Sequence, residues 1–218
     1  MVQVLRSLLV TVIVIMNTAD ASESSSPEAR LRQAAAAGDA QAVRDLLRRG
    51  ANIEARDDRG RSPLLLATHA AAIEAARVLI EAGADVNAMD DISDSPYLYA
   101  GAEGPLEILR MTLEHGADLA SVNRYGGTAL IPAAHHGHVD IVRELLGTGI
   151  DIDHVNYLGW TALLEAVILG DGGRRQQDVV RILLTRGADP TIADRDGGTA
   201  LQHARNRGFT ELADLLTD

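Results

Sequence analysis

The sequence predicts an all-α fold, a solenoid of stacked helix-turn-helix units that carry hairpin-like fingers. The first observation behind this prediction is a short motif of Gly, then Ala or Ile, then Asn or Asp. It recurs at intervals of 33, 33, 33 and 38 residues. A fixed period of this length is typical of repeat proteins, in which each unit buries its apolar face against its neighbours. The motif begins at Gly50, Gly83, Gly116, Gly149 and Gly187.

The second observation is another motif that keeps the same register. It consists of Ser or Thr, then Pro or Ala, then a hydrophobic residue, and it also recurs at intervals of 33, 33, 33 and 38 residues. The hydroxyl group of the first residue can accept a hydrogen bond from an unpaired amide at a helix start, and Pro is well tolerated at the first helical position. We therefore expect a helix after each copy. The copies begin at Ser62, Ser95, Thr128, Thr161 and Thr199.

Each unit contains a second predicted helix. The first helix is rich in Ala and ends at a Gly, as at Gly137. The second carries apolar pairs four residues apart, and these pairs make one buried stripe. The recurring Gly then supplies a left-handed C-cap, and the Gly-bearing turn that follows predicts a projecting finger. In the fourth unit the apolar pairs are Ile141, Val142, Leu145 and Leu146.

The units resemble the ankyrin repeat, whose core reads Gly-x-Thr-Pro-Leu-x-x-Ala-Ala-x-x-Gly-His. From Gly126 to Val142 the fourth unit reads Gly-Gly-Thr-Ala-Leu-Ile-Pro-Ala-Ala-His-His-Gly-His-Val-Asp-Ile-Val. The resemblance covers residues 29–218 and implies an ankyrin-repeat domain of about six units, whose first and last members are caps. The expected units are approximately 29–57, 58–90, 91–123, 124–156, 157–194 and 195–218.

Some positions depart from the family pattern. In the third unit, Ser93 stands where the finger usually has a Gly, and Pro105 follows Gly104 where His is usual. The His that follows Thr-Pro-Leu in the family is replaced in every unit, so we expect its finger-bracing hydrogen bonds to be rearranged or absent. The replacing residues are Leu65, Leu98, Ile131, Leu164 and Gln202.

The first 21 residues have the order of a secretory signal peptide. Arg6 precedes an uncharged run at residues 8–16, and Ala19-Asp20-Ala21 provides a small-x-small cleavage site. The run is too short to cross a bilayer, which takes roughly 20 apolar residues. We expect cleavage after Ala21, a polar tether at residues 22–28, and a periplasmic or secreted protein with no stable membrane insertion. An uncleaved anchor is the alternative.

Charge and missing motifs exclude several classes of function. Without the leader the chain has 19 basic and 30 acidic residues, because Arg6 and Asp20 are lost from totals of 20 and 31, so its net charge stays at −11. Such a surface repels phosphate backbones, and we expect no nucleic acid partner. The sequence has no Cys, and it lacks a Gly-x-Ser-x-Gly elbow, a Walker loop and an HExxH zinc motif. We therefore expect neither an enzyme nor a cofactor.

The resemblance implies a non-catalytic protein-binding scaffold that recognises a partner with its finger tips and the exposed face of each first helix. We predict a monomer that binds another protein. Three aromatic residues fall in two adjacent fingers, where they would make good hot spots. Alternatively, Tyr125 and Trp160 pack against the neighbouring finger. We expect truncation of Trp160 to weaken binding and leave the fold intact. The predicted partner-binding residues are Arg59, Arg61, Ile92, Asp94, Arg124, Tyr125, His135, His136, Tyr157, Leu158, Trp160, Ile168 and Leu169.

The fifth unit is five residues longer than the others. We place the extra residues between its two helices, at residues 170–177. Loops on rigid scaffolds often carry function, and Arg174 with Arg175 could hold an acidic group. A flexible insertion without function is the other reading.

Two polar groupings raise the question of chemistry. His135, His136 and His138 invite a metal site, but adjacent helical residues diverge by about 100 degrees, and we predict no metal. Glu165 and His203 occupy equivalent positions in adjacent units, so we expect them to form a hydrogen-bonded pair that fixes register rather than an acid–base pair. The alternative functions are small-ligand or metal handling in the envelope, and an exported effector that acts on a host protein.

Overall fold

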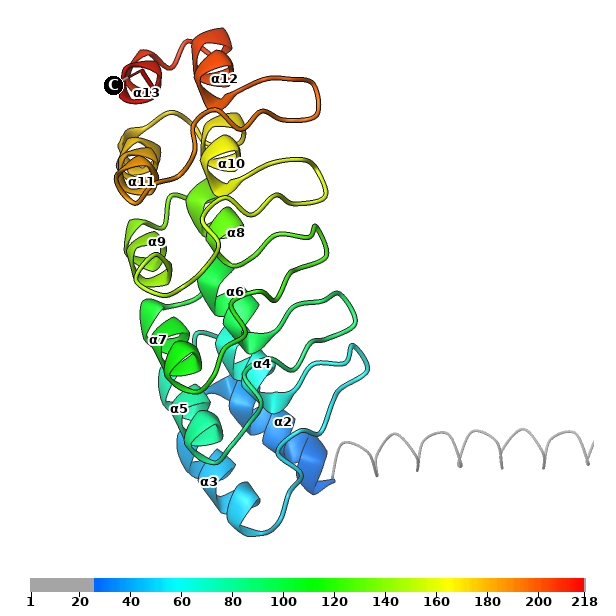
Figure 1. The fold of residues 1–218 in the computed structure, drawn as a ribbon. Coiled ribbons are helices and arrows are strands. Elements are labelled where there is room, and N and C mark those ends of the chain that lie inside the picture. The colour runs from blue at the N-terminus through cyan, green and yellow to red at the C-terminus, as the bar shows by residue number, and fades with distance from the viewer. Residues whose placement is uncertain (1–25, 218) are drawn as a thin grey trace, which may run out of the picture.

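The computed structural model describes residues 26–217, and in this part of the chain the helices form six consecutive pairs (Figure 1). The first helices of the pairs are α2 (Pro27–Ala37), α4 (Pro63–His69), α6 (Pro96–Ala102), α8 (Leu130–His135), α10 (Ala162–Ile168) and α12 (Ala200–Asn206). The second helices are α3 (Ala40–Arg48), α5 (Ile73–Glu81), α7 (Leu106–Glu114), α9 (Val139–Leu145), α11 (Arg174–Thr185) and α13 (Thr210–Leu215).

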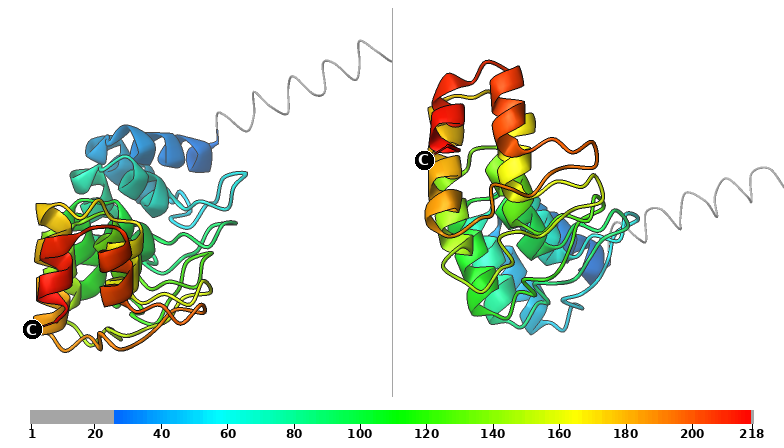
Figure 2. Two further views of the ribbon diagram at one scale, coloured as in Figure 1. Left: turned by 90° about the horizontal axis from the view of Figure 1, so that it is seen from above. Right: turned by 45° about the horizontal axis from the view of Figure 1, so that its top comes forward.

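The helices stand in two columns, and loops project from the column of first helices (Figures 1 and 2). The stack bends so that these loops, the fingers, lie on its concave side. The described residues contain no named strand, and one isolated bridge joins Ala193 to Thr199. The predicted all-helical stack is confirmed. No helix among the described residues is long and apolar enough to cross a membrane.

The predicted hydroxyl caps form in every copy of the motif except the third, at Thr128. The hydroxyl oxygens of Ser62 and Thr161, for example, accept the amides of Leu65 and Leu164 at 3.2 Å. At Thr128 the prediction is wrong. The amide of Ile131 donates instead to the carbonyl oxygen of Thr128 at 3.2 Å, and the buried Thr128 hydroxyl has no partner.

The predicted left-handed C-caps also form in every copy of their motif except one. Gly50, Gly83, Gly116 and Gly187 have φ of 85°, 91°, 84° and 93°. Gly149 is not in this conformation, so its predicted role is wrong. In this unit the Thr148 hydroxyl donates to the carbonyl oxygen of Leu145 at 2.6 Å and accepts the amide of Ile150 at 3.2 Å. A side chain thus satisfies the backbone groups that a left-handed Gly satisfies elsewhere.

Aliphatic side chains fill the space between the two columns, and small residues set the spacing within the column of first helices. Leu79, Ile108 and Leu109 are fully buried, and each such side chain contributes about 1.5–3 kcal/mol relative to an exposed position. A Cβ atom at Gly101 of α6 would lie 2.6 Å from that of Ala129, just before α8. Successive first helices therefore pack closely.

Each finger is held by one Asp or Asn side chain. Asn123 Oδ1, for example, accepts the amides of Tyr125 at 2.9 Å and Gly127 at 3.1 Å. The fingers therefore have bracing that does not use the family's missing His. Numbered by unit, the second to sixth fingers are 57–61, 90–94, 123–127, 156–160 and 194–198, and their bracing residues are Asp57, Asp90, Asn123, Asn156 and Asp194.

The ends and the insertion differ from the sequence interpretation in detail. The predicted signal peptide lies outside the described residues. Helix α2 begins at Pro27, within the predicted tether, because the Ser26 hydroxyl caps it. The extra residues of the fifth unit do not all form a loop, since α11 begins at Arg174 and is 12 residues long. Gln176 in its first turn is buried and donates to the carbonyl oxygen of His135 at 3.2 Å, which anchors the added turn.

Candidate functional site

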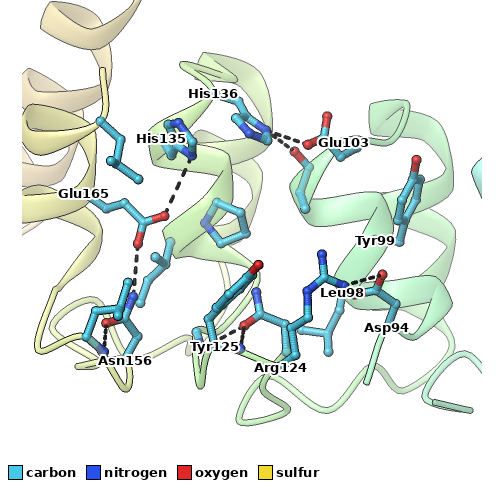
Figure 3. A pocket seen from close by; sticks show the side chains of 17 residues that line it. Asp94, Leu98, Tyr99, Glu103, Arg124, Tyr125, His135, His136, Asn156 and Glu165 are labelled. Carbon is cyan, nitrogen blue, oxygen red and sulfur yellow. Dashed lines mark hydrogen bonds and ion pairs between the residues drawn. The ribbon is translucent and has the colours of Figure 1, made fainter. Parts of the chain in front are cut away.

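A pocket of about 540 Å³ opens on the concave side, between the third, fourth and fifth units (Figure 3). Helices α6, α8 and α10 and the fingers of the same units form its walls. Its size falls in the range of roughly 300–1,000 Å³ that is usual for ligand sites. The apolar lining includes Leu98, Ile131, Pro132, Leu158 and Leu169, and the charged or titratable lining includes Asp94, Glu103, Arg124, His135, His136 and Glu165.

The pocket exists because of the residues at one repeated position of the first helices. This position carries Leu66, Tyr99, Pro132, Glu165 and His203 in successive units. Pro132 has a short ring and stands between two longer side chains. Figure 3 shows the tyrosine on α6 and the glutamate on α10, with α8 between them. The row of side chains is therefore hollowed at α8.

Glu165 is the buried acid of the pocket. The residue is 8% exposed, and its Oε2 accepts a hydrogen bond from Asn156 Nδ2 at 3.0 Å. The other oxygen, Oε1, lies 3.8 Å from His135 Nδ1, which is too long for a hydrogen bond. Burial raises the pKa of Glu165 to about 7, although the nearby His136 and the Asn156 hydrogen bond both act to lower it. Burial also lowers the pKa of His135.

An arginine and a tyrosine stand at the pocket mouth. Arg124 Nη1 lies 3.6 Å from Asp94 Oδ2, and the guanidinium carbon lies 5.1 Å from the centre of the Tyr125 ring. Tyr125 itself is 54% exposed. Partial burial raises the pKa of Asp94, and Arg124 opposes this. The mouth thus offers an exposed aromatic face beside an ion pair.

The junction between the third and fourth fingers differs from the junctions that precede and follow it. The amide of Asp91 donates to the carbonyl oxygen of Arg59 at 3.1 Å, which joins the second and third fingers. The amide of Tyr157 donates to the carbonyl oxygen of Tyr125 at 2.9 Å, which joins the fourth and fifth fingers. No backbone hydrogen bond joins the third and fourth fingers within residues 26–217; the Arg124–Asp94 ion pair spans this junction instead.

A cluster of Glu103, His136 and His138 lies just after α6 and α8, and its first two members line the pocket. His136 Nδ1 is 3.0 Å from Glu103 Oε1 and 3.1 Å from the carbonyl oxygen of Ala102. Ligand atoms of Glu103, His136 and His138 all lie within 4.8 Å of one another. The sequence interpretation considered His138 with its two neighbours but not Glu103 as part of this group. The 33-residue period contained the signal, because Glu103 occupies the position of His136 one unit earlier.

The structure brings about half of the predicted partner-binding residues together and leaves the others elsewhere. Arg61 is bound by Asp57 of its own finger at 2.7 Å. Ile92 is 51% exposed at the tip of the third finger. The ring of Tyr157 covers Gly126, since a Cβ atom added at Gly126 would lie 2.5 Å from that ring. Those that line the pocket are Asp94, Arg124, Tyr125, His135, His136, Leu158 and Leu169. Those that do not are Arg59, Arg61, Ile92, Tyr157, Trp160 and Ile168.

Trp160 is not a free finger-tip side chain. It is partly buried and packs against the hydrophobic core, and its amide donates to Asn156 Oδ1 at 3.0 Å. Truncation of Trp160 is therefore expected to lower the stability of the fold as well, since a smaller side chain leaves a cavity at the base of the finger. Leu158, at 47% exposed, is the outward-facing residue of this finger that lines the pocket.

The predicted pair of Glu165 and His203 does not form. Each side chain instead bonds the bracing residue of its own finger, nine positions earlier. Glu165 accepts from Asn156, and His203 Nε2 lies 2.6 Å from Asp194 Oδ2. The prediction was wrong because equivalent helix positions were assumed to face across the stack, whereas both side chains turn toward the finger.

Paired helices, fingers on the concave side and a groove along the first helices define a repeat scaffold. A family model for ankyrin repeats matches residues 31–123 and 98–194, and these matches cover most of the chain. The chain belongs to the ankyrin-repeat family. Domains of this family are generally protein-binding scaffolds without catalytic activity.

Several bacterial proteins are similar to this chain. The crystal structure of an ankyrin repeat domain from Acinetobacter baumannii AYE is 59% identical, with a TM-score of 0.83 over 86% of this chain and 95% of that one. The ankyrin repeat protein EF0377 is 45% identical, with a TM-score of 0.84 over 88% and 98%. The putative ankyrin repeat protein YahD of Escherichia coli K12 is 52% identical over 52 residues, which span 24% of this chain and 26% of YahD.

Proposed function

We propose that this protein is a non-catalytic scaffold that binds a partner protein on its concave side, with the pocket between α6, α8 and α10 as the anchor site. One observation carries the proposal. Exposed apolar side chains from two adjacent fingers and from the C-terminal end of α10 converge on a single pocket. These are Tyr125, Leu158 and Leu169, at 54%, 47% and 44% exposed.

The energetics of such a surface suit binding. Hot spots cluster where aromatic and apolar anchors enter well-packed pockets at the centre of an interface. The fingers that carry Tyr125 and Leu158 are each fixed by two amide hydrogen bonds to one side chain, and one backbone bond joins the two. Little conformational entropy is therefore lost on binding, which favours affinity.

The test is site-specific photo-crosslinking in the source bacterium. A benzoylphenylalanine in place of Tyr125 is expected to capture a partner on irradiation. The same group in place of Arg181, which is exposed on the outer helix α11, is the matched control and is expected to capture nothing. The combination Tyr125→Ala with Leu158→Ala should abolish co-purification of the captured protein. Equal adducts at both positions would place partner binding elsewhere.

We further propose that the scaffold works in the periplasm. The support is the order of a basic residue, an apolar run and a small-x-small site in residues 1–21. N-terminal sequencing of the protein from a periplasmic fraction is expected to begin at Ser22. A chain that keeps Met1, or one found only in the cytoplasm, would overturn this location.

A second candidate function, metal handling, is favoured by the cluster of Glu103, His136 and His138. Two imidazoles and a carboxylate are ligands suited to zinc. If the cluster binds zinc, addition of the ion raises the melting temperature of the protein, and Glu103→Gln removes the increase. A melting temperature that does not respond to zinc would eliminate this candidate.

A further inference from the structure

The pocket contains a carboxylate oxygen that lacks a hydrogen-bond donor. The side chain of Glu165 is 11% exposed, and Asn156 engages only its Oε2. No hydrogen bond to Oε1 occurs among the described residues, and the carboxylate points toward His135 across the pocket (Figure 3). Oε1 is open to the pocket space rather than sealed in the core, and a hydrogen bond to a charged acceptor is stronger than one between neutral groups. The site therefore favours a ligand that brings a donor to this oxygen.

The position of His135 beside Glu165 limits the kinds of hydrogen-bond donor that fit between them. His135 Nδ1 lies 3.8 Å from Glu165 Oε1, and burial lowers the pKa of this imidazole, so that it is neutral near pH 7. In the tautomer that carries its proton on Nε2, Nδ1 accepts. One donor atom placed between these two atoms can reach both at ordinary hydrogen-bond distances of about 2.8 Å. That atom must carry at least two hydrogens, which excludes a hydroxyl group.

Charge favours an ammonium group over the other donors. Asp94 and Glu103 also line the pocket, and its single arginine, Arg124, is already paired with Asp94. An ammonium is a compact cation with three donors on one nitrogen. A guanidinium binds best to both oxygens of one carboxylate, and Oε2 of Glu165 is already occupied by Asn156.

The walls suit the stem of a lysine. Leu98, Ile131 and Leu158 also line the pocket, and methylene groups pack well on such apolar surfaces. The rings of Tyr99 and Tyr125 also line the pocket, and a cation or a flanking residue of a peptide can lie against them.

We propose that the pocket binds a lysine side chain of the partner protein, with its ammonium group held between Glu165 Oε1 and His135 Nδ1. This inference rests on the proposed function for the source of the lysine. The preference for an ammonium group rests on the pocket alone and can be tested separately.

Binding of an ammonium group is coupled to proton release. The cation favours the ionised form of Glu165, so it lowers the pKa of that carboxyl, and affinity rises as pH increases from about 5.5 to about 8. Other titratable or charged groups also line the pocket, namely Asp94, Glu103, Arg124, His135 and His136. On α12 the nearby groups are His203, which is paired with Asp194, and Arg207, which donates to the carbonyl oxygen of Ile168. Protonation of His135 at low pH repels the ammonium and acts in the same direction.

The first experiment uses the full chain and N-acetyl-lysine methylamide as the probe, with titration followed by NMR. We expect saturable binding that is tenfold to about a hundredfold weaker for the Nε-acetylated probe and for Glu165→Gln. The glutamine keeps the hydrogen bond from Asn156 and loses the charge. Glu107→Gln, on the outer face of α7, is the matched control and should leave affinity unchanged. Equal affinity for the neutral probe or for Glu165→Gln, or no saturation, would overturn the proposal.

The second experiment separates this inference from the proposed function. Random heptapeptides displayed on phage are selected on the wild-type chain and on Tyr125→Ala with Leu158→Ala. Selected peptides with a recurrent lysine support both proposals. Peptides that depend on Tyr125 and Leu158 but carry no lysine overturn the inference and leave the scaffold function standing. If the lysine probe binds and no peptide is selected, the ammonium preference stands and the protein partner is refuted.

Discussion

The fifth and sixth units carry the same polar contact in opposite orientation. In the fifth unit the finger residue Asn156 donates to Glu165 on α10. In the sixth, His203 on α12 contacts the finger residue Asp194. Both pairs are nine residues apart and join a finger to its inner helix. The carboxylate lies on the helix in one unit and on the finger in the other.

The orientation decides the chemistry of the carboxylate. On the finger, Asp194 accepts the amide of Gly198, and this bond, followed by that to His203, lowers its pKa. On the helix, Glu165 receives no backbone amide, and burial raises its pKa to about 7. The same contact between finger and helix therefore yields either an acid with its hydrogen bonds satisfied or an acid with a free acceptor oxygen. The pocket beside Glu165 is where the free acceptor meets open space.

The largest effect on this comparison is expected from removal of the bracing residues. Asn156→Ala removes the acceptor of two finger amides and the donor to a buried carboxylate. We expect a loss of about 3 kcal/mol in the free energy of unfolding, measured with urea. Asp194→Ala should cost less, because its finger and partner are less buried. Equal losses would show that burial does not separate the two units.

The next effect concerns pH. The folded-state pKa of Glu165 is raised above its usual 4.5, so its contribution to stability is present below about pH 4.5 and is lost as pH rises through about 7. The loss amounts to about 3 kcal/mol at most. Urea titrations of Glu165→Gln should show a flatter pH profile and higher stability than wild type at about pH 8. Asp194→Asn tests the opposite sign. Because the pKa of Asp194 is lowered, its ionised carboxylate stabilises the fold at neutral pH, and this contribution is lost as the pH falls into the acid range. Parallel profiles for wild type and Glu165→Gln would contradict the buried acid.

A smaller effect is expected from Trp160. Trp160→Ala should lower the free energy of unfolding by about 2 kcal/mol, because the partly buried ring packs against the core. Tyr157→Ala, in the same finger and 64% exposed, is the control and should cost much less. A fully stable Trp160→Ala that has lost partner binding would restore the hot-spot interpretation.

The smallest effect is expected from Ser93. Its φ of 63° is left-handed, whereas Gly60 and Gly126 occupy this place in other fingers. Ser93→Gly should therefore raise the free energy of unfolding by about 1 kcal/mol. The reverse change, Gly126→Ser, should be destabilising, because any Cβ atom there meets the Tyr157 ring. Loss of stability in Ser93→Gly would mean that the serine side chain contributes more than its backbone costs.

The fold was predictable because its signals are local. A Ser or Thr that caps a helix, or a Gly that ends one, acts on amides within a few residues, and a period of 33 reveals each repetition. The exceptions at Thr128 and Gly149 arose where a neighbouring backbone or hydroxyl group took over the same task. The sequence also predicted that the finger braces would change, but not which residues would supply them.

The pocket could be predicted only in part. Finger positions such as Tyr125 and Arg124 followed from the register, whereas the cavity depends on side-chain volumes in three successive units. A short Pro132 between Tyr99 and Glu165 makes it, and no local signal marks that combination. Register gives the position of Trp160 in its finger but not the direction of its side chain, so the sequence could not decide between a binding role and a packing role.

The ion pair at the pocket mouth has a consequence for the mechanics of the finger layer. The side chains of Arg124 and Asp94 are 46% and 19% exposed, so dissolved salt reaches them. Screening acts over about 8 Å at physiological ionic strength, and it weakens such a contact while it leaves backbone hydrogen bonds almost unchanged. The contact between the third and fourth fingers therefore weakens as the salt concentration rises. The backbone hydrogen bonds that join the second finger to the third, and the fourth to the fifth, do not weaken in this way.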